Sequence, residues 1–125
     1  METVQTMLEQ ATTISDFYLL LGDFLDEFYR VDTGVRQRMI AEAPHGLALN
    51  SKREHLAFMA ATVHKLANDY HLDVPPWVWE SRYYLYDKPF FDGARGDLRL
   101  WYMYKSPSEF KHRNLFVDEN ALARV

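Results

Sequence analysis

Two long stretches of this 125-residue sequence repeat apolar residues at the spacing of an amphipathic helix, and they restrict the chain to a helical fold. The first stretch follows Thr13-Ile14-Ser15-Asp16, a variant of the helix-starting capping box with an acidic residue in its fourth position. Its apolar face consists of Ile14, Phe17, Tyr18, Leu21, Phe24, Leu25 and Phe28. We therefore expect a long amphipathic helix beginning near residue 14.

The second stretch begins at Ser51-Lys52-Arg53-Glu54, a complete capping box, and stops before Pro75-Pro76. One face of this expected helix is apolar and consists of Leu56, Met59, Ala60, Val63, Leu66, Ala67 and Tyr70. We predict that it forms the centre of the core.

Shorter elements are expected around these two helices. Val35 to Ala43 can form a helix that packs as a hairpin with the first one, and Asp97 can cap a helix over residues 98–105. Ser106-Pro107-Ser108-Glu109 predicts a further helix start, with Ser106 as the cap and Pro107 in the first turn. The sequence therefore predicts a single all-α domain over residues 1–125, with about five helices.

The aromatic segment from Trp77 to Phe91 has neither helical nor strand periodicity. We predict a packed, irregular connector here, and connectors of this length inside a compact domain are often functional. It is the expected place for a pocket, with the candidate lining residues Trp77, Trp79, Tyr84 and Phe90.

Composition limits the chemistry and the location of the protein. The sequence has no cysteine, so disulfides and thiol chemistry are excluded. Its N-terminal residues lack the pattern of a secretory signal, and no stretch approaches the roughly 18 apolar residues of a membrane span. We expect a soluble, cytoplasmic protein with no membrane partner.

Charge disfavours nucleic acid as a partner but keeps it as the alternative. Residues 1–80 contain 6 Lys and Arg against 12 Asp and Glu, whereas residues 81–125 contain 8 against 6. This mild basic excess is weaker than phosphate binding usually requires. Cations interleaved with aromatic residues over 82–105 nevertheless fit a surface for single-stranded nucleic acid, although three aspartates dilute the charge.

The acidic outer face of the first helix is typical of a solvated surface, or of one that docks a basic partner.

No pattern predicts catalytic residues, a metal site or a cofactor. The histidines lack zinc-binding spacing, although His64 and His71 could share a helix face. Glu109 lies three and four residues before His112 and Arg113, which favours an ion pair on a helix. The competing interpretation is a small hydrolase or nuclease built on these three residues, which requires them to share a concave pocket.

The C-terminal residues, from Ser106-Pro107 through Arg113-Asn114 to Val125, resemble the ending of a family of small bacterial proteins. The resemblance extends more loosely to Pro76-Trp77-Val78 and to Lys88-Pro89-Phe90-Phe91, so it covers residues 76–125. In that family the region stands alone or follows a helix-turn-helix domain, as in antitoxin components of toxin–antitoxin pairs. The helix pair expected at residues 14–43 lacks the basic residues of a recognition helix.

This resemblance implies an interaction protein whose C-terminal segment binds a protein partner, with a cognate toxin as one candidate. Independently of the resemblance, we keep a second copy of the chain as a candidate partner. Aromatic and arginine anchors dominate protein interfaces, so we expect contacts from Trp101, Phe110, Arg113 and Phe116. The shared motif adds Asn114 and Asn120 to the predicted partner-binding residues.

Overall fold

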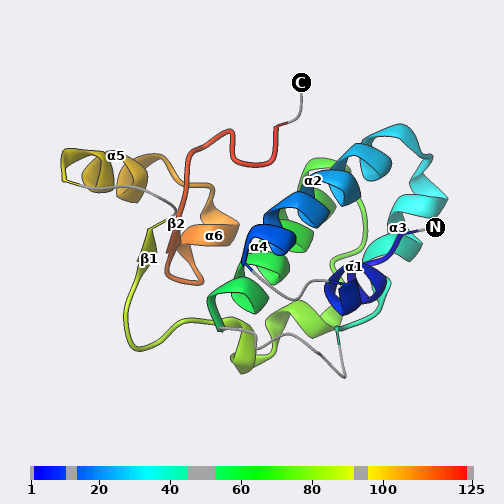
Figure 1. The fold of residues 1–125 in the computed structure, drawn as a ribbon, viewed down its shortest axis with the longest axis horizontal. Coiled ribbons are helices and arrows are strands. Elements are labelled where there is room, and N and C mark those ends of the chain that lie inside the picture. The colour runs from blue at the N-terminus through cyan, green and yellow to red at the C-terminus, as the bar shows by residue number, and fades with distance from the viewer. Residues whose placement is uncertain (1, 11–13, 45–52, 92–95, 124–125) are drawn as a thin grey trace.

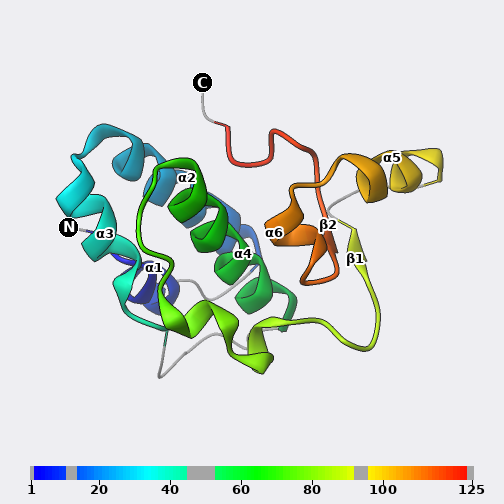
Figure 2. The same cartoon turned by 180° about the vertical axis from the view of Figure 1, so that it is seen from behind.

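A computed structural model describes residues 2–10, 14–44, 53–91 and 96–123 of the protein. Its helices are α1 (Val4–Gln10), α2 (Ile14–Arg30), α3 (Thr33–Ala41), α4 (Arg53–Asp69), α5 (Asp97–Lys105) and α6 (Ser108–Lys111). Two 3₁₀ turns, η1 (Pro76–Trp79) and η2 (Ser81–Tyr83), and two short strands, β1 (Phe90–Phe91) and β2 (Leu115–Phe116), complete it. The predicted all-α class is confirmed (Figures 1 and 2).

Helix α4 forms the centre of the core, as predicted, and α2 packs along it in the same direction. The ring of Phe17 in α2 lies 4.9 Å from His55 and 6.0 Å from Phe58 in α4, measured between centroids. At the other end, Phe28 lies 5.4 Å from Tyr70, just past α4. The buried face of α2 matches the predicted stripe over Phe17, Leu21, Phe24, Leu25 and Phe28. Thr13 and Ser51, the predicted caps of these helices, lie outside the described residues.

Helix α1 was missed by the sequence reasoning. Val4, Met7 and Leu8 are fully buried against the core, and their spacing of three and four residues is that of a helix face. A seven-residue helix offers too few positions for periodicity to stand out. Packing against α2, and not its own propensity, stabilises it.

Helix α3 starts two residues earlier than predicted and also ends earlier. The carboxylate of Asp32 caps it by accepting a hydrogen bond from the Val35 N–H at 2.9 Å. Arg36 then reaches back and donates to the Phe28 C=O at 2.9 Å, at the end of α2. This bond satisfies one of the carbonyls that a helix end leaves unpaired and fixes the turn between the two helices.

The aromatic connector is more ordered than predicted. Trp77 in η1 donates its ring N–H to the Ile40 C=O at 3.0 Å, and Tyr83 in η2 packs 5.1 Å from the Trp77 ring. Beyond η2, the backbone forms β1, which pairs with β2 in parallel, Phe90 facing Leu115 and Phe91 facing Phe116. The sequence reasoning predicted no strands, because two-residue strands are too short to show alternation.

The predicted starts of the last two helices are corrected in detail. Gly96, with a φ of 58°, occupies the cap position of α5, so Asp97 is its first residue. Ser106 does not cap α6, which begins at Ser108 after Pro107. The Ser106 hydroxyl instead accepts from the Val117 N–H at 2.9 Å and lies 2.5 Å from the Tyr102 C=O, to which it donates. It therefore ties the end of α5 to the residue that follows β2.

Replacing Ser106 with alanine is expected to lower the free energy of unfolding by about 1–2 kcal/mol, because the buried Val117 N–H loses its acceptor. The matched control is Ser108→Ala, which changes an exposed serine two residues away and should cost less than about 0.5 kcal/mol. Urea denaturation of both variants measures the difference. Equal stability of the two would contradict the bridging role.

Candidate functional site

Three of the predicted partner-binding residues lie inside the fold. Phe110 and Arg113 are 0% and 1% exposed, and Phe116 is 8% exposed. Asn114 has a φ of 66° and forms the turn between α6 and β2, where its C=O accepts from the Phe90 N–H at 3.0 Å. These residues close the C-terminal part of the fold, and the buried ones offer a partner almost no surface. Only Trp101 and Asn120 of the predicted set are exposed.

Arg113 connects three elements of the core. Its Nη1 donates to the Glu109 C=O at 2.9 Å and lies 3.1 Å from His64 Nδ1, while Nη2 donates to the Val78 C=O at 2.9 Å. Its Nε–H has no acceptor among the described residues. Because a guanidinium only donates hydrogen bonds, His64 must accept at Nδ1 and carry its proton on Nε2. Arg113 thus holds α6, η1 and α4 together.

Two residues of the predicted pocket surround this guanidinium, and neither lines the two cavities described below. The Arg113 Cζ lies 4.7 Å from the centre of the Tyr84 ring and 5.7 Å from that of Trp79. Trp79 also packs edge-on against His64, at 4.6 Å between ring centroids. Among the described residues, no carboxylate lies within ion-pair distance of Arg113. The cation–π contacts with these two rings therefore stabilise its buried charge. Trp77, the third predicted pocket residue, is buried in the core.

The environment of Arg113 shifts three pKa values. Partial burial and the positive charge of Arg113 lower the pKa of His64 below its ordinary 6.5. Burial also lowers the pKa of Arg113, while Tyr84 and Glu109 raise it. The guanidinium stays charged at neutral pH. Burial alone would raise the pKa of Glu109, but hydrogen bonds from Asn68 and the backbone, with Lys65 and His64 nearby, bring it below 4.5.

The lowered pKa of His64 predicts a loss of stability in mild acid. The unfolded protein binds a proton on His64 near pH 6.5, whereas the folded protein does so only at lower pH. The stability contributed by neutral His64 is therefore complete above pH 6.5 and is lost as the pH falls through the folded-state pKa. Urea denaturation at about pH 7.5 and about pH 5.5 should show this decrease.

The matched variant for this effect is His64→Gln, whose amide oxygen can accept from Arg113 but does not titrate. We expect a smaller decrease in its unfolding free energy over the same pH range. If the variant and the wild-type protein lose stability equally, His64 is not the group responsible.

The hydrolase interpretation finds no geometric support. Arg113 is buried, whereas His112 is exposed. The predicted ion pair of Glu109 is also absent from the described contacts: its carboxylate accepts from Asn68 at 2.8 Å, and Arg113 donates to the Glu109 backbone C=O instead. None of the three lines either cavity described below. His55 and His64 lie apart, because His55 packs against Phe17 while His64 packs against Trp79. Across the described ranges, no three His, Asp or Glu side chains gather to hold a metal.

The most unusual surface belongs to α5. None of its nine residues is buried. Its five large apolar side chains are between 46% and 74% exposed: Leu98, Leu100, Trp101, Met103 and Tyr104. Leu100, Trp101 and Tyr104 are the most exposed, and they share one helix face because Tyr104 follows Leu100 by four residues and Trp101 by three. We call these three residues the α5 face.

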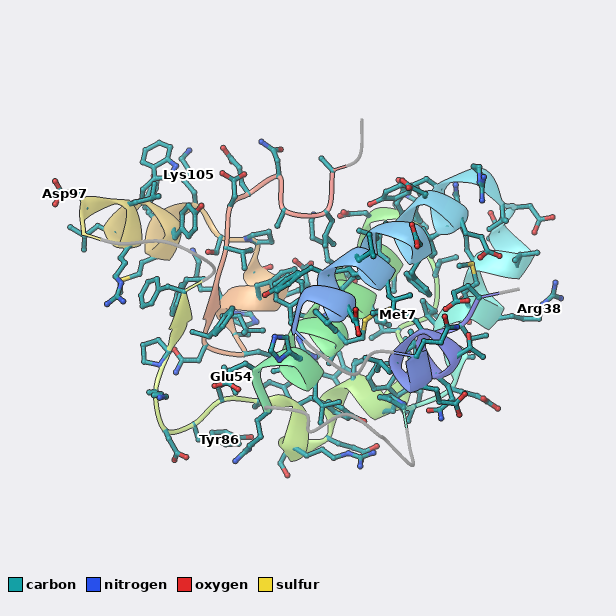
Figure 3. All side chains as sticks on the ribbon, viewed as in Figure 1. Met7, Arg38, Glu54, Tyr86, Asp97 and Lys105 are labelled. Carbon is teal, nitrogen blue, oxygen red and sulfur yellow. The ribbon has the colours of Figure 1, made fainter. Side chains whose placement is uncertain are left out.

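Helix α5 projects from the end of the molecule opposite α3 (Figures 1 and 2). The Ser106 hydroxyl holds its last turn, and Lys111 Nζ donates to the Tyr104 C=O at 3.1 Å. On the side facing the body, the Arg99 guanidinium lies 4.9 Å from the Phe91 ring centre. In Figure 3, Asp97 and Lys105 mark the two ends of the helix, and Arg38 lies at the far end of the molecule. The α5 face is therefore fixed in place, and each of its three side chains stays more than half exposed.

Two cavities open on the described surface. One, of about 440 Å³, lies between α4, the segment before β1 and α5, and Phe90 is the only predicted pocket residue that lines it. The other, of about 420 Å³, lies beside the C-terminal segment and includes the predicted residue Asn120. Sequence reasoning missed the remaining lining residues, since residues 53–54, 85–91 and 99 meet only through the fold.

Comparison of the sequence and fold with protein-family models, with curated proteins and with solved structures gave no significant match. Among the described helices, none combines the length and the apolar character needed to cross a bilayer.

Proposed function

We propose that this protein is an interaction module that binds a protein partner through α5. The observation that carries the proposal is the exposure of five large apolar side chains on a helix with no buried residue. A helix with this many large apolar side chains normally buries them in a core. Contiguous exposed apolar surface on a soluble protein marks an interaction site.

The side chains of α5 define the chemistry of the partner. The α5 face suits a hydrophobic groove, the mode in which a helix is recognised through a few anchors spaced along one side. Lys105 Nζ lies 5.3 Å from the ring centres of both Trp101 and Tyr104, so a positive charge borders the anchors. A groove with an acidic rim complements this arrangement.

The family resemblance supports a more specific candidate. Helix α5 lies within residues 76–125, the region that resembles antitoxin components. A cognate toxin is therefore the partner to test first, and a second copy of this protein is the other outcome that the same surface allows.

A nucleic-acid partner is the second candidate, and one observation favours it. Over residues 82–105, three cationic side chains lie on aromatic rings: Arg82 on Tyr83, Arg99 on Phe91 and Lys105 on Trp101. Of the three rings Trp101 is the exposed one, and an exposed pair of this kind can stack a base and contact a phosphate. Binding of this type weakens steeply with salt, whereas apolar docking does not.

Co-purification from the native host tests the proposal and separates the candidates. The tagged protein is isolated at about 0.1 M and about 1 M salt, and bound protein and nucleic acid are identified. A bound protein that persists at high salt and is lost from the Trp101→Ala variant supports α5 docking. Nucleic acid released by high salt supports the alternative, and a tagged protein that emerges alone at both salt concentrations overturns the proposal.

A further inference from the structure

The 440 Å³ cavity beside α5 is built by three separate parts of the protein. Arg53 and Glu54 come from the first turn of α4, residues 85–91 come from the segment leading into and forming β1, and Arg99 comes from α5. Figure 3 labels Glu54 and Tyr86, which lie on two of these parts. Its volume is within the range of roughly 300–1,000 Å³ found for small-molecule sites.

Cationic side chains meet at this cavity from all three parts. Arg53, Lys88 and Arg99 line it, against two carboxylates, Glu54 and Asp87. Within the described residues, Arg53 and Lys88 form no ion pair, although Arg53 Nη2 donates to the Tyr84 C=O at 3.0 Å. The first turn of α4 adds the positive end of a 17-residue helix dipole. The charges therefore favour an anionic group in the cavity.

The apolar wall of the cavity is aromatic and held in place. Phe90 and Phe91 are half-buried, and they are fixed by pairing with Leu115 and Phe116 in the β ladder. The Phe91 ring also stacks on Phe116 at 5.0 Å between centroids. Tyr86 and Pro89 extend this wall toward solvent. A flat ring can pack against such a surface at little cost in ordering.

We propose that this cavity binds a nucleoside monophosphate or a small molecule of the same chemistry, an aromatic ring that carries an anionic group. Arg53 and Lys88 bind the phosphate, because charge-assisted bonds to phosphate are strong. Phe90 packs against the base, while the Phe91 ring, already covered by Phe116 and Arg99, supports this wall from within. Glu54 and Asp87 accept hydrogen bonds from the amino groups of the base or from the sugar hydroxyls. A site with cationic side chains alone would leave these donors unpaired.

Calorimetric titration of the full-length protein with AMP, GMP, CMP and UMP tests this site. We expect saturable binding to at least one of them below about 1 mM, and at least about tenfold weaker binding of the corresponding nucleoside and of inorganic phosphate. Arg53→Gln and Lys88→Gln should each weaken binding about fivefold or more. The matched control is Arg82→Gln, an exposed arginine of the same segment that lies outside the cavity, and it should bind as the wild-type protein does.

Three results would overturn the proposal. They are no binding up to about 10 mM, binding unaffected by both cavity variants, and phosphate or nucleoside binding as tight as that of the nucleotide. Lys88 is exposed, so Lys88→Gln should keep the wild-type unfolding midpoint. If Arg53→Gln changes the midpoint, the binding result of Lys88→Gln decides the question. The cavity includes none of the three residues of the α5 face. A negative result for nucleotide binding is therefore distinguishable from a negative result for α5 docking.

Discussion

Replacing Arg113 with alanine is expected to lower the free energy of unfolding by about 3 kcal/mol or more, which is a large share of the stability of a domain of this size. The substitution removes the donors for two backbone carbonyls, those of Glu109 and Val78, and leaves a void among α4, α6 and η1. Both terms are costly in a buried setting, since Arg113 is 1% exposed. Urea denaturation followed by circular dichroism measures the change.

Two further variants separate the causes of this loss. Arg113→Met keeps much of the side-chain volume but none of the donors, so it should still cost about 1 kcal/mol or more. Arg82→Ala is the control, because the half-exposed Arg82 side chain makes only surface contacts, an ion pair with Glu80 at 3.3 Å and a contact with the Tyr83 ring at 4.9 Å, and it should cost less than about 0.5–1 kcal/mol. A methionine variant as stable as the wild-type protein would show that the hydrogen bonds of Arg113 contribute nothing net.

Replacing Trp101 with alanine is expected to weaken partner binding by about 30-fold or more, because tryptophan anchors contribute about 2 kcal/mol or more at interface centres. The side chain is 52% exposed in the free protein, so the unfolding midpoint should change little. Titration of the purified partner against both proteins measures the loss. A loss of binding accompanied by unfolding would not support the proposal, so the midpoint is measured for each variant.

A pair of leucines provides the matched comparison for this prediction. Leu100 lies on the α5 face and is 67% exposed, while Leu19 lies on α2 and is 68% exposed. Leu100→Ala should weaken binding by several-fold, and Leu19→Ala should leave it unchanged. The same loss in both variants would place the contact elsewhere or make it non-specific.

The long helices could be predicted from the sequence because their signals are local. The stripe from Phe17 to Phe28 repeats over about three turns and predicts both the helix and its buried face. Helix α4 was predicted from the same kind of pattern. By contrast, β1 forms only because Asn114 turns the backbone after α6 and presents its C=O to Phe90, a contact that no local pattern encodes.

The candidate sites were less predictable, because burial depends on which elements meet. Phe110 and Arg113 have the residue types of interface anchors, yet the fold uses both inside the molecule. Leu100 and Tyr104 look like core residues in the sequence, yet α5 projects away from the core and exposes them. The C-terminal motif therefore closes the fold at α6 and β2, and the exposed apolar surface lies one helix earlier, on α5.

Photo-crosslinking in the native host tests α5 docking most directly. A photoreactive amino acid replaces Tyr104, the most exposed large apolar residue of α5, and in a second protein it replaces Arg38, which is exposed on α3 at the far end of the molecule (Figure 3). We predict a single crosslinked protein adduct from position 104 and none from position 38. No adduct at position 104, or the same adducts at both positions, would contradict the account.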